Sequence, residues 1–210
     1  MESLAYVLTS GWASGVNVYA TVLVTGLIGR WGGVGGVPDV LERTDVLLAA
    51  AALTAVEFVA DKIPYVDSAW DAVQTAIRPT IGAVLGALLA GESDDLGEAV
   101  GAVLGGSTAL ASHAAKASLR LAVNASPEPV SNIVLSLAED TAVVGVLLLA
   151  VDHPWAALAI ALTLLAAGAA LAVFLIRTIR GGGTGFSGAR SPSRPASTAC
   201  ARRRRPRGLM

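Results

Sequence analysis

Two series of polar side chains recur at helical spacing in the apolar parts of this sequence. Members of the first series are separated by four, three and four residues: Asp67, Asp71, Gln74 and Arg78. The second series is basic and has a similar spacing: His113, Lys116 and Arg120. Because side chains three and four residues apart share one face of an α-helix, each series predicts a polar stripe along a helix.

Further polar groups extend these two stripes into a candidate cluster. Its predicted members are Asn17, Glu57, Asp61, Asp71, Arg78, His113, Lys116, Arg120, Glu139 and Asp140. A charged side chain at membrane depth costs at least ~2.5 to 3.5 kcal/mol on insertion scales, so these groups should contact one another or water. The sequence therefore predicts a polar interior with charges of both signs.

Two interpretations of this cluster are open at the level of sequence. In the first, the cluster lines a cavity that opens toward the cytoplasm. Its basic members would then suit an anion, and its carboxylates would suit protons or cations. In the second, the charges are structural, and Lys116 and Arg120 either form fixed bridges with Glu139 and Asp140 or extend to the membrane interface.

His113 is the one histidine that we expect within the membrane, and an imidazole exchanges protons near neutral pH. It has no second histidine or cysteine at a spacing useful for a metal, because His153 is expected at the opposite membrane surface. The sequence also lacks the motifs of serine hydrolases, zinc proteases, Walker-type nucleotide sites and dinucleotide-binding enzymes. We therefore expect no metal, no cofactor and no catalytic residue.

The composition indicates which elements position these groups. Hydrophobic residues make up 54% of the 210 residues, charged residues make up 15%, and the mean hydropathy is +0.64. Soluble domains have roughly 45–50% and 25% of these classes, so this chain is too apolar to be one. Crossing a hydrocarbon core takes about 20 apolar residues. Six stretches approach that length: 4–29, 45–62, 67–90, 97–123, 130–151 and 154–178.

These stretches predict an all-α polytopic membrane bundle of about six transmembrane helices. The first stretch contains Gly11, Gly15 and Gly26, which could break it into two pieces. Two GxxxG pairs, which favour close helix packing, are Gly82 with Gly86 and Gly97 with Gly101. Pro79 makes the segment 78–82 a second candidate for a discontinuous helix.

Basic residues near helix ends indicate the cytoplasmic side of a membrane protein. The last 30 residues contain seven Arg and no acidic residue, so we expect them in the cytoplasm. Lys62, Lys116 and Arg120 then lie toward the same side and the acidic link 92–98 lies outside, whereas Arg30 and Arg43 are exceptions. Six spans would place the N-terminus in the cytoplasm as well, and the expected location is the inner membrane of the cell.

The tail is predicted to be separate from the transmembrane domain. Residues 1–180 form that domain, and residues 181–210 are rich in Gly, Ser, Pro and Arg and should be a disordered cytoplasmic tail. Five arginines could hold anionic lipid headgroups at about 1 kcal/mol per charge: Arg202, Arg203, Arg204, Arg205 and Arg207. The alternative is that they only anchor the topology or belong to a dispensable extension.

A short repeat raises the hypothesis of internal duplication. The sequence VDSAW at 66–70 resembles VDHPW at 151–155, and each begins a predicted helix. If each half of the chain contributes three spans, the two halves must be inverted relative to one another.

Several motifs carry a resemblance to a known family. They are the run EFVADKIP at 57–64, VDS at 66–68, WD at 70–71, IRP at 77–79, GVNVY at 15–19, the pair His113 and Lys116, SPEP at 126–129, and ED at 139–140. In these motifs the chain resembles a bacterial membrane family catalogued as domain of unknown function 4126. The resemblance covers about residues 5–178 and implies a multi-pass membrane protein without indicating an activity.

Two functions follow as expectations. The first is a small transporter or channel that moves a charged solute or ion through the polar cluster. The alternative is a membrane scaffold or assembly protein with structural ion pairs and a tail that binds lipid or a partner. Membrane lipids are the expected partners in addition to the solute, an enzyme or a specific nucleic-acid partner is not expected, and a homo-oligomer is left open.

Overall fold

All regular structure in the described part of the chain is helical. The computed structural model describes residues 2–63, 65–92, 97–124 and 129–182. The helices are α1 (Glu2–Val16), α2 (Val18–Gly32), α3 (Asp39–Glu42), α4 (Thr44–Ala60), α5 (Val66–Gly91), α6 (Glu98–Asn124), α7 (Pro129–Asp152) and α8 (Pro154–Gly182). The all-α fold class is thereby confirmed, and the five predicted stretches from residue 45 onward agree with α4 to α8 within a few residues.

Three of these helices are long and apolar enough to cross a membrane. They are α5, the part of α7 from Val130 to Asp152, and the part of α8 from Pro154 to Thr178. Helix α4 has 17 residues, and α6 carries His113, Lys116 and Arg120. At 1.5 Å per residue α4 is about 25 Å long, slightly less than a typical hydrocarbon core of ~30 Å. The membrane character is supported, whereas the predicted number of six spans is not confirmed.

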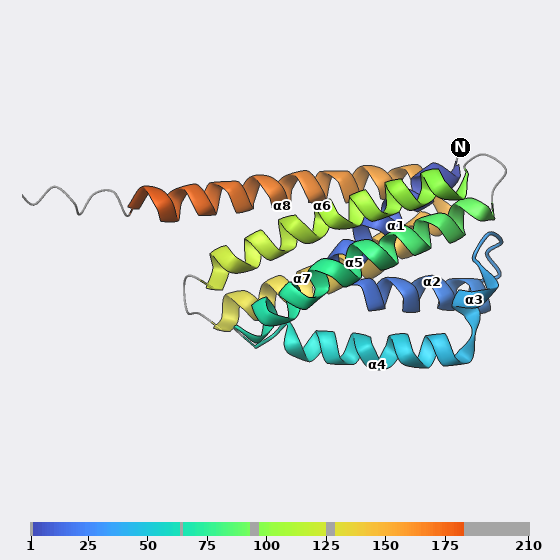
Figure 1. The fold of residues 1–210 in the computed structure, drawn as a ribbon, viewed down its shortest axis with the longest axis horizontal. Helices are drawn as coiled ribbons and strands as arrows, with labels where there is room; N and C mark the ends of the chain where they lie inside the picture. The colour runs from blue at the N-terminus through green and yellow to red at the C-terminus, as the bar shows by residue number, and fades with distance from the viewer. Residues whose placement is uncertain (1, 64, 93–96, 125–128, 183–210) are drawn as a thin grey trace, which may run out of the picture.

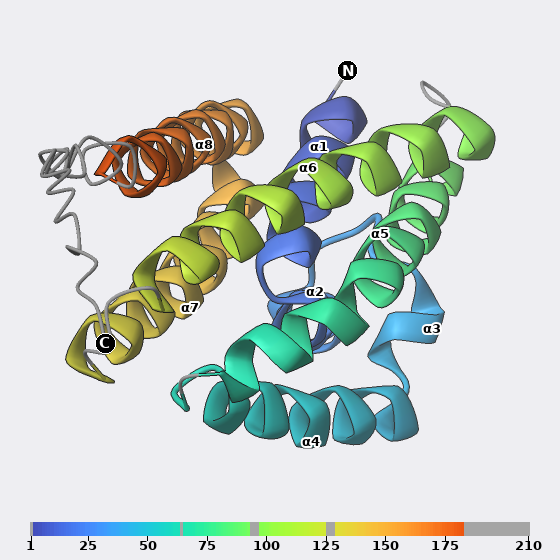
Figure 2. The ribbon, with the colours of Figure 1, turned by 60° about the vertical axis from the view of Figure 1, so that its left-hand side comes forward.

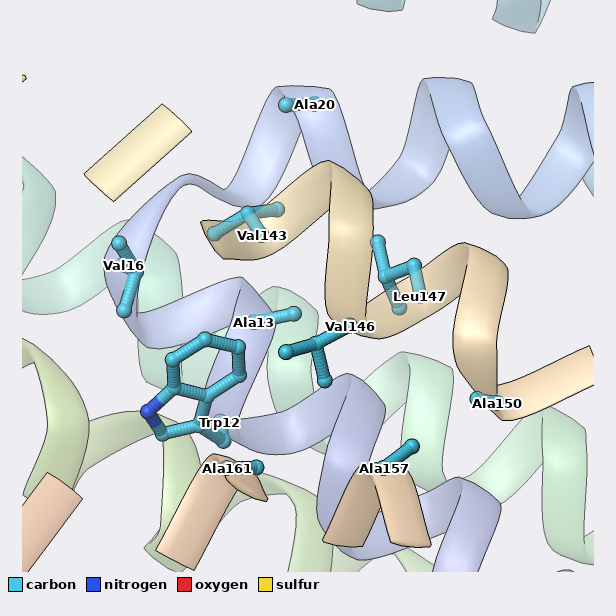
Figure 3. Close-up of a cluster of buried hydrophobic side chains, with 10 residues drawn as sticks. All are labelled: Trp12, Ala13, Val16, Ala20, Val143, Val146, Leu147, Ala150, Ala157 and Ala161. Atoms are coloured by element: carbon cyan, nitrogen blue, oxygen red, sulfur yellow. The ribbon is translucent and has the colours of Figure 1, made fainter. Parts of the chain in front are cut away.

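The first predicted stretch, 4–29, is a helical hairpin and not one helix. The chain breaks at Asn17, whose backbone is extended (φ −148°, ψ 98°), and α2 returns toward the end at which α1 begins (Figures 1 and 3). Glu2 at the start of α1 and Ile28 near the end of α2 accordingly line the same cavity. Each arm has 15 residues, or about 22 Å of helix, so neither arm spans a bilayer alone.

The two ends of the bundle can be defined by the segments that meet there. The N-terminal end contains Glu2, the link from α2 to α4, the end of α5 and the 152–154 turn, and the hydroxyl of Tyr6 donates to the carbonyl of Val151 there. The C-terminal end contains the turn after α4, the end of α6 and the end of α8 (Figure 1). The N-terminus and the end of α8 therefore lie at opposite ends of the bundle. The α1–α2 hairpin causes this separation, because it reverses direction before α4 begins. The predicted orientation of the two termini in the membrane stays a prediction.

Helices α5 and α6 form the most extensive helix pair and are closest near the N-terminal end. Glycines on both helices make this approach possible, because a Cβ on Gly86 would meet the backbone of Gly101, and one on Gly105 would meet the backbone of Gly82. The predicted pair at Gly82 and Gly86 thus packs as expected. The pair expected at 97 and 101 is instead formed by Gly101 and Gly105, since a Cβ on Gly97 would meet open space.

From this contact α5 and α6 diverge toward the C-terminal end, and the α1–α2 turn lies between them (Figure 2). An apolar core holds the hairpin on its other side. It joins α1 and α2 to α7 and α8 through Trp12, Ala13, Val16, Ala20, Val143, Val146, Leu147, Ala150, Ala157 and Ala161 (Figure 3). Helix α5 continues through Pro79, so the discontinuous helix is at Asn17 and not at 78–82.

The predicted inverted repeat is not confirmed. The VDSAW segment begins α5 at the C-terminal end of the bundle, and the VDHPW segment leads into α8 at the N-terminal end, so the two helices run in opposite directions. However, the first half of the chain contains a hairpin where the second half has a long helix.

Candidate functional site

The predicted polar residues come together in one buried group between the diverging helices. Glu57 and Asp61 come from the end of α4 and the residue after it, and α5, α6 and α7 each contribute their polar stripe. We call this group the charged cluster: Glu57, Asp61, Asp67, Asp71, Arg78, His113, Lys116, Arg120 and Glu139. The cluster extends from the C-terminal end to about the middle of α5, where Arg78 lies.

Arg78 connects four segments of the chain. Its Nη2 donates to Oε1 of Glu57 at 2.5 Å, and its Nη1 lies 3.3 Å from Oδ1 of Asp71. The same Nη1 donates to the carbonyl oxygen of Gly15 at 3.1 Å. The Arg78 and Glu57 side chains have no exposed surface, so this is a fully buried ion pair.

His113 is held as a neutral hydrogen-bond acceptor. Its Nδ1 lies 2.9 Å from Nη1 of Arg78, and a guanidinium can only donate, so Nδ1 carries no proton. Its Nε2 lies 3.0 Å from the hydroxyl of Thr75 and carries the ring hydrogen. The histidine that we expected within the membrane is therefore oriented by Arg78 in this structure.

Arg120 is the second organising cation. Its Nη2 lies 2.9 Å from Oδ2 of Asp61 and 2.8 Å from Oε2 of Glu139, and its Nη1 lies 3.5 Å from Oδ2 of Asp67. Asp67 also accepts hydrogen bonds from the side-chain amide of Asn124 and from the backbone of the following residue. Asn124 was not predicted as a member of the site, because a single amide at a helix end gives no sequence pattern.

Lys116 lies between the two arginines. Its Nζ donates to Oδ2 of Asp61 at 2.8 Å and lies 3.5 Å from Glu139 and 3.8 Å from Glu57. The predicted bridges to Glu139 are thus present for both Lys116 and Arg120. The predicted bridges to Asp140 are absent, because Asp140 points to the hairpin instead.

Asp140 and Lys62 form the less buried rim of the cluster. Asp140 accepts a hydrogen bond from the amide of Asn17 at 3.1 Å, and Nζ of Lys62 lies 3.9 Å away from its other oxygen. Burial lowers the pKa of Lys62, which lies in the turn after α4, and the charge of Asp140 partly offsets this effect. Each side chain of this pair is about one-fifth exposed.

The turn of the hairpin supplies backbone groups to the cluster. Gly15 accepts from Arg78, and Val16 accepts from Lys116 at 2.8 Å, so the carbonyl end of α1 faces two cations. The side chain of Asn17 caps α2 by accepting from the amide of Ala20 at 2.9 Å. Close packing requires glycine at position 15, because a Cβ there would meet the backbone of Ala109.

The cluster is closed in this structure, in contrast to the open cavity that the first interpretation predicted. The side chains of Glu57, Arg78 and Arg120 are fully buried. Lys116 and Glu139 border a cavity of about 270 Å³ between α1, α6, α7 and α8, and the other walls of this cavity are almost entirely apolar. In the described residues, no group of three or more His, Cys, Asp or Glu side chains is arranged to hold a metal ion.

The predicted lipid-binding arginines, Arg202 to Arg205 and Arg207, lie outside the described residues, as does nearly all of the predicted tail. No curated protein and no solved structure matches the chain. One family model matches most of it, from residue 4 to residue 175, and thus covers the hairpin, the glycine contact and the whole charged cluster. The chain therefore belongs to the family described as domain of unknown function 4126 (DUF4126).

Proposed function

We propose that this protein is a multi-pass inner-membrane protein that moves a small charged solute or ion through the charged cluster. The observation that carries the proposal is the break at Asn17, which brings two helix ends to a buried cluster of charges at about half the length of α5. Secondary transporters use discontinuous helices in this way, because helix ends offer unpaired backbone groups and dipole charge at the depth of the membrane. On this proposal α4 to α8 cross the membrane, and the α1–α2 hairpin enters and leaves on one side.

Reconstituted protein tests this proposal directly. Liposomes that contain the purified protein are assayed for flux of protons, sodium, potassium and chloride, with the Arg78→Gln and Glu139→Gln variants compared at equal amounts of folded protein. We expect flux of at least one ion, and we expect both variants to lose it although they insert and remain folded. Unchanged flux in both variants would contradict the proposal. Asp45→Asn is the control, because Asp45 is exposed and pairs with the exposed Arg43, away from the charged cluster.

The orientation has a separate test. Positive charges near the C-terminal end of the bundle favour a cytoplasmic location for the end of α8. Because the N-terminus lies at the other end of the bundle, we expect it outside. The chain contains a single cysteine, Cys200, which serves as a natural label for the tail. A membrane-impermeant thiol reagent should label Cys200 only after cells are permeabilised. In a Cys200→Ala background, Ser3→Cys should react without permeabilisation.

A second candidate function is favoured by the closed state of the cluster. Each carboxylate and each cation of the charged cluster has an opposite charge within 4 Å, as a rigid membrane scaffold would require. Replacing a buried ion pair with apolar groups is often tolerated structurally. If Glu57→Leu combined with Arg78→Leu keeps the cellular function, the scaffold is favoured over the transporter. If deletion of residues 181–210 abolishes function while the membrane domain stays folded, the tail carries that scaffold role.

A further inference from the structure

The charges in the buried cluster do not balance. Five carboxylates face three cations there: Glu57, Asp61, Asp67, Asp71 and Glu139 against Arg78, Lys116 and Arg120. His113 adds no charge, because its Nδ1 accepts from Arg78. The rim pair Lys62 and Asp140 contributes one charge of each sign and leaves the excess unchanged. Two negative charges therefore remain without a compensating cation in a buried site, where uncompensated charge is unfavourable.

The hydrogen bonds show the same imbalance. Buried acceptor oxygens without a donor among the described residues include Oε2 of Glu57, Oδ1 of Asp61, both carboxylate oxygens of Asp71 and Oε1 of Gln74. The unpartnered donors within the cluster are the Nε groups of Arg78 and Arg120. Acceptors outnumber donors, so the cluster favours an added positive charge over an added anion.

Among the carboxylates of the cluster, Asp71 is the least compensated by cations and hydrogen-bond donors. Its closest cations are Nη1 of Arg78 at 3.3 Å and Nε of Arg120 at 4.0 Å, and neither donates a hydrogen bond to it. Arg78 has a closer partner in Glu57, and Arg120 has closer partners in Asp61 and Glu139. Asp67, one turn earlier on the same face, differs because it accepts several hydrogen bonds.

We propose that Asp71 is the binding site for a monovalent cation, either a proton or an alkali-metal ion, which enters the charged cluster. This inference rests on the transport function proposed above and names the chemical class of its ion. A proton would convert the carboxylate into a neutral carboxylic acid, and an alkali ion would be held by carboxylate and amide oxygens. The absence of a three-ligand metal arrangement among the described residues does not favour a divalent ion.

The groups that surround this site come from four helices and the hairpin. Helix α5 itself contributes Asp67, Gln74 and Arg78, and α4 with the residue after it contributes Glu57 and Asp61. Helix α6 contributes His113, Lys116 and Arg120, and α7 contributes Glu139. The hairpin contributes Tyr19, whose hydroxyl accepts a hydrogen bond from the amide of Gln74. A change in the charge of Asp71 is therefore transmitted first to Arg78 and Arg120.

Infrared difference spectroscopy of the full chain in lipid nanodiscs tests the proposal. Spectra are recorded between alkaline and acidic pH, and between choline chloride and sodium chloride at constant pH. Wild type is compared with Asp71→Asn, with Asp71→Glu and with the exposed control Asp45→Asn. A thermal melt of each sample establishes that the variant is folded, and we expect Asp71→Asn to be at least as stable as wild type.

A carboxylic-acid band that appears on acidification, disappears in Asp71→Asn and persists in Asp45→Asn would assign the proton. A sodium-dependent change of the carboxylate bands with the same dependence on Asp71 would assign the alkali ion. In Asp71→Glu the signal should return at a shifted frequency. If neither change depends on Asp71, or if Asp71→Asn is unfolded while Asp71→Glu retains the wild-type signals unshifted, the inference is wrong.

The outcome of the infrared experiment can be separated from the outcome of the transport assay. Asp71-dependent binding without any flux would contradict the proposed transport and leave the cation site in place. Conversely, chloride flux that persists in Asp71→Asn without any cation signal would contradict the cation site and leave transport in place.

Discussion

The same face of the α5–α6 pair is buried in two different ways along its length. Toward the N-terminal end the contact is made by glycines, and toward the C-terminal end the same helix faces carry charged side chains. At the glycine end the helices touch through backbone atoms, whereas at the charged end they diverge around the hairpin turn (Figure 2). The glycine end therefore depends on shape, because an added methyl group has no space. The charged end depends on ion pairing, because its carboxylates and its cations are buried within about 4 Å of one another.

The α5–α6 pair thus has a glycine half, toward the N-terminal end, and a charged half, toward the C-terminal end. The two halves should differ in how well they tolerate substitutions. In the glycine half, the contact is local and one substitution disturbs one neighbouring turn. In the charged half, one cation contacts several carboxylates, so its loss weakens the compensation of all of them at once. We therefore expect large, non-additive effects in the charged half and smaller, additive effects in the glycine half.

The largest expected effect is the loss of Arg120. Arg120→Met removes the cation shared by Asp61, Asp67 and Glu139 and should lower the free energy of unfolding by about 3–5 kcal/mol, the range for breaking a buried ion pair. The measurement is the unfolding midpoint in a denaturing-detergent titration. Arg177→Met is the control, because Arg177 is exposed on α8 and should leave the midpoint unchanged. Equal midpoints for both variants would mean that the cluster is not buried in the membrane.

A methyl group tests the glycine half. Gly101→Ala would press its Cβ against the backbone of Gly86 and should destabilise the protein by about 1–3 kcal/mol, as overpacking does. Gly145→Ala on α7 is the matched control, since its Cβ would meet open space. That control should be neutral or stabilising by about 0.5–1 kcal/mol. The same unfolding titration separates the two, and a stable Gly101→Ala protein would refute the close backbone contact.

A double-mutant cycle measures how strongly the charges are coupled. Glu57→Gln, Arg78→Gln and the double variant should give an interaction free energy of about 0.5–3 kcal/mol, because the two side chains form a buried pair. The same cycle between Glu57 and the distant, exposed Arg177 should give no coupling. An additive result at Glu57 and Arg78 would remove the proposed contrast between the two halves.

The smallest expected effect concerns the hairpin turn. Asn17→Ala removes both the cap on α2 and the hydrogen bond to Asp140, and should cost about 0.5–2 kcal/mol. Asn17→Ser retains an oxygen that can cap α2 and should recover part of this loss. Thermal melts in detergent provide the comparison. If the Asn17→Ser and Asn17→Ala variants are equally destabilised, the hydrogen bond to Asp140 contributes more to stability than the cap.

Much of the fold follows from local sequence pattern. The stretches from residue 45 onward coincide with α4 to α8, because apolar length and flanking Pro, Gly and charged residues determine where such helices begin and end. The two polar stripes were also predictable, since helical periodicity alone places Asp71 with Arg78 and Lys116 with Arg120 on one face. Burial of those faces followed from the unfavourable free energy of exposing charges to lipid.

The tertiary structure decided what periodicity cannot. The break at Asn17 is stabilised because the carbonyls of Gly15 and Val16 accept hydrogen bonds from cations on α5 and α6. Those cations are about 60 to 100 residues away in sequence. The partner of each carboxylate also depends on distances between helices, which is why Asp140 contacts Asn17 and not Lys116. The sequence by itself determined the helices from α4 to α8, their polar faces and the membrane character. The path of the chain between them, and with it the separation of the N-terminus from the end of α8 and the closure of the cluster, required contacts that form only when the helices pack.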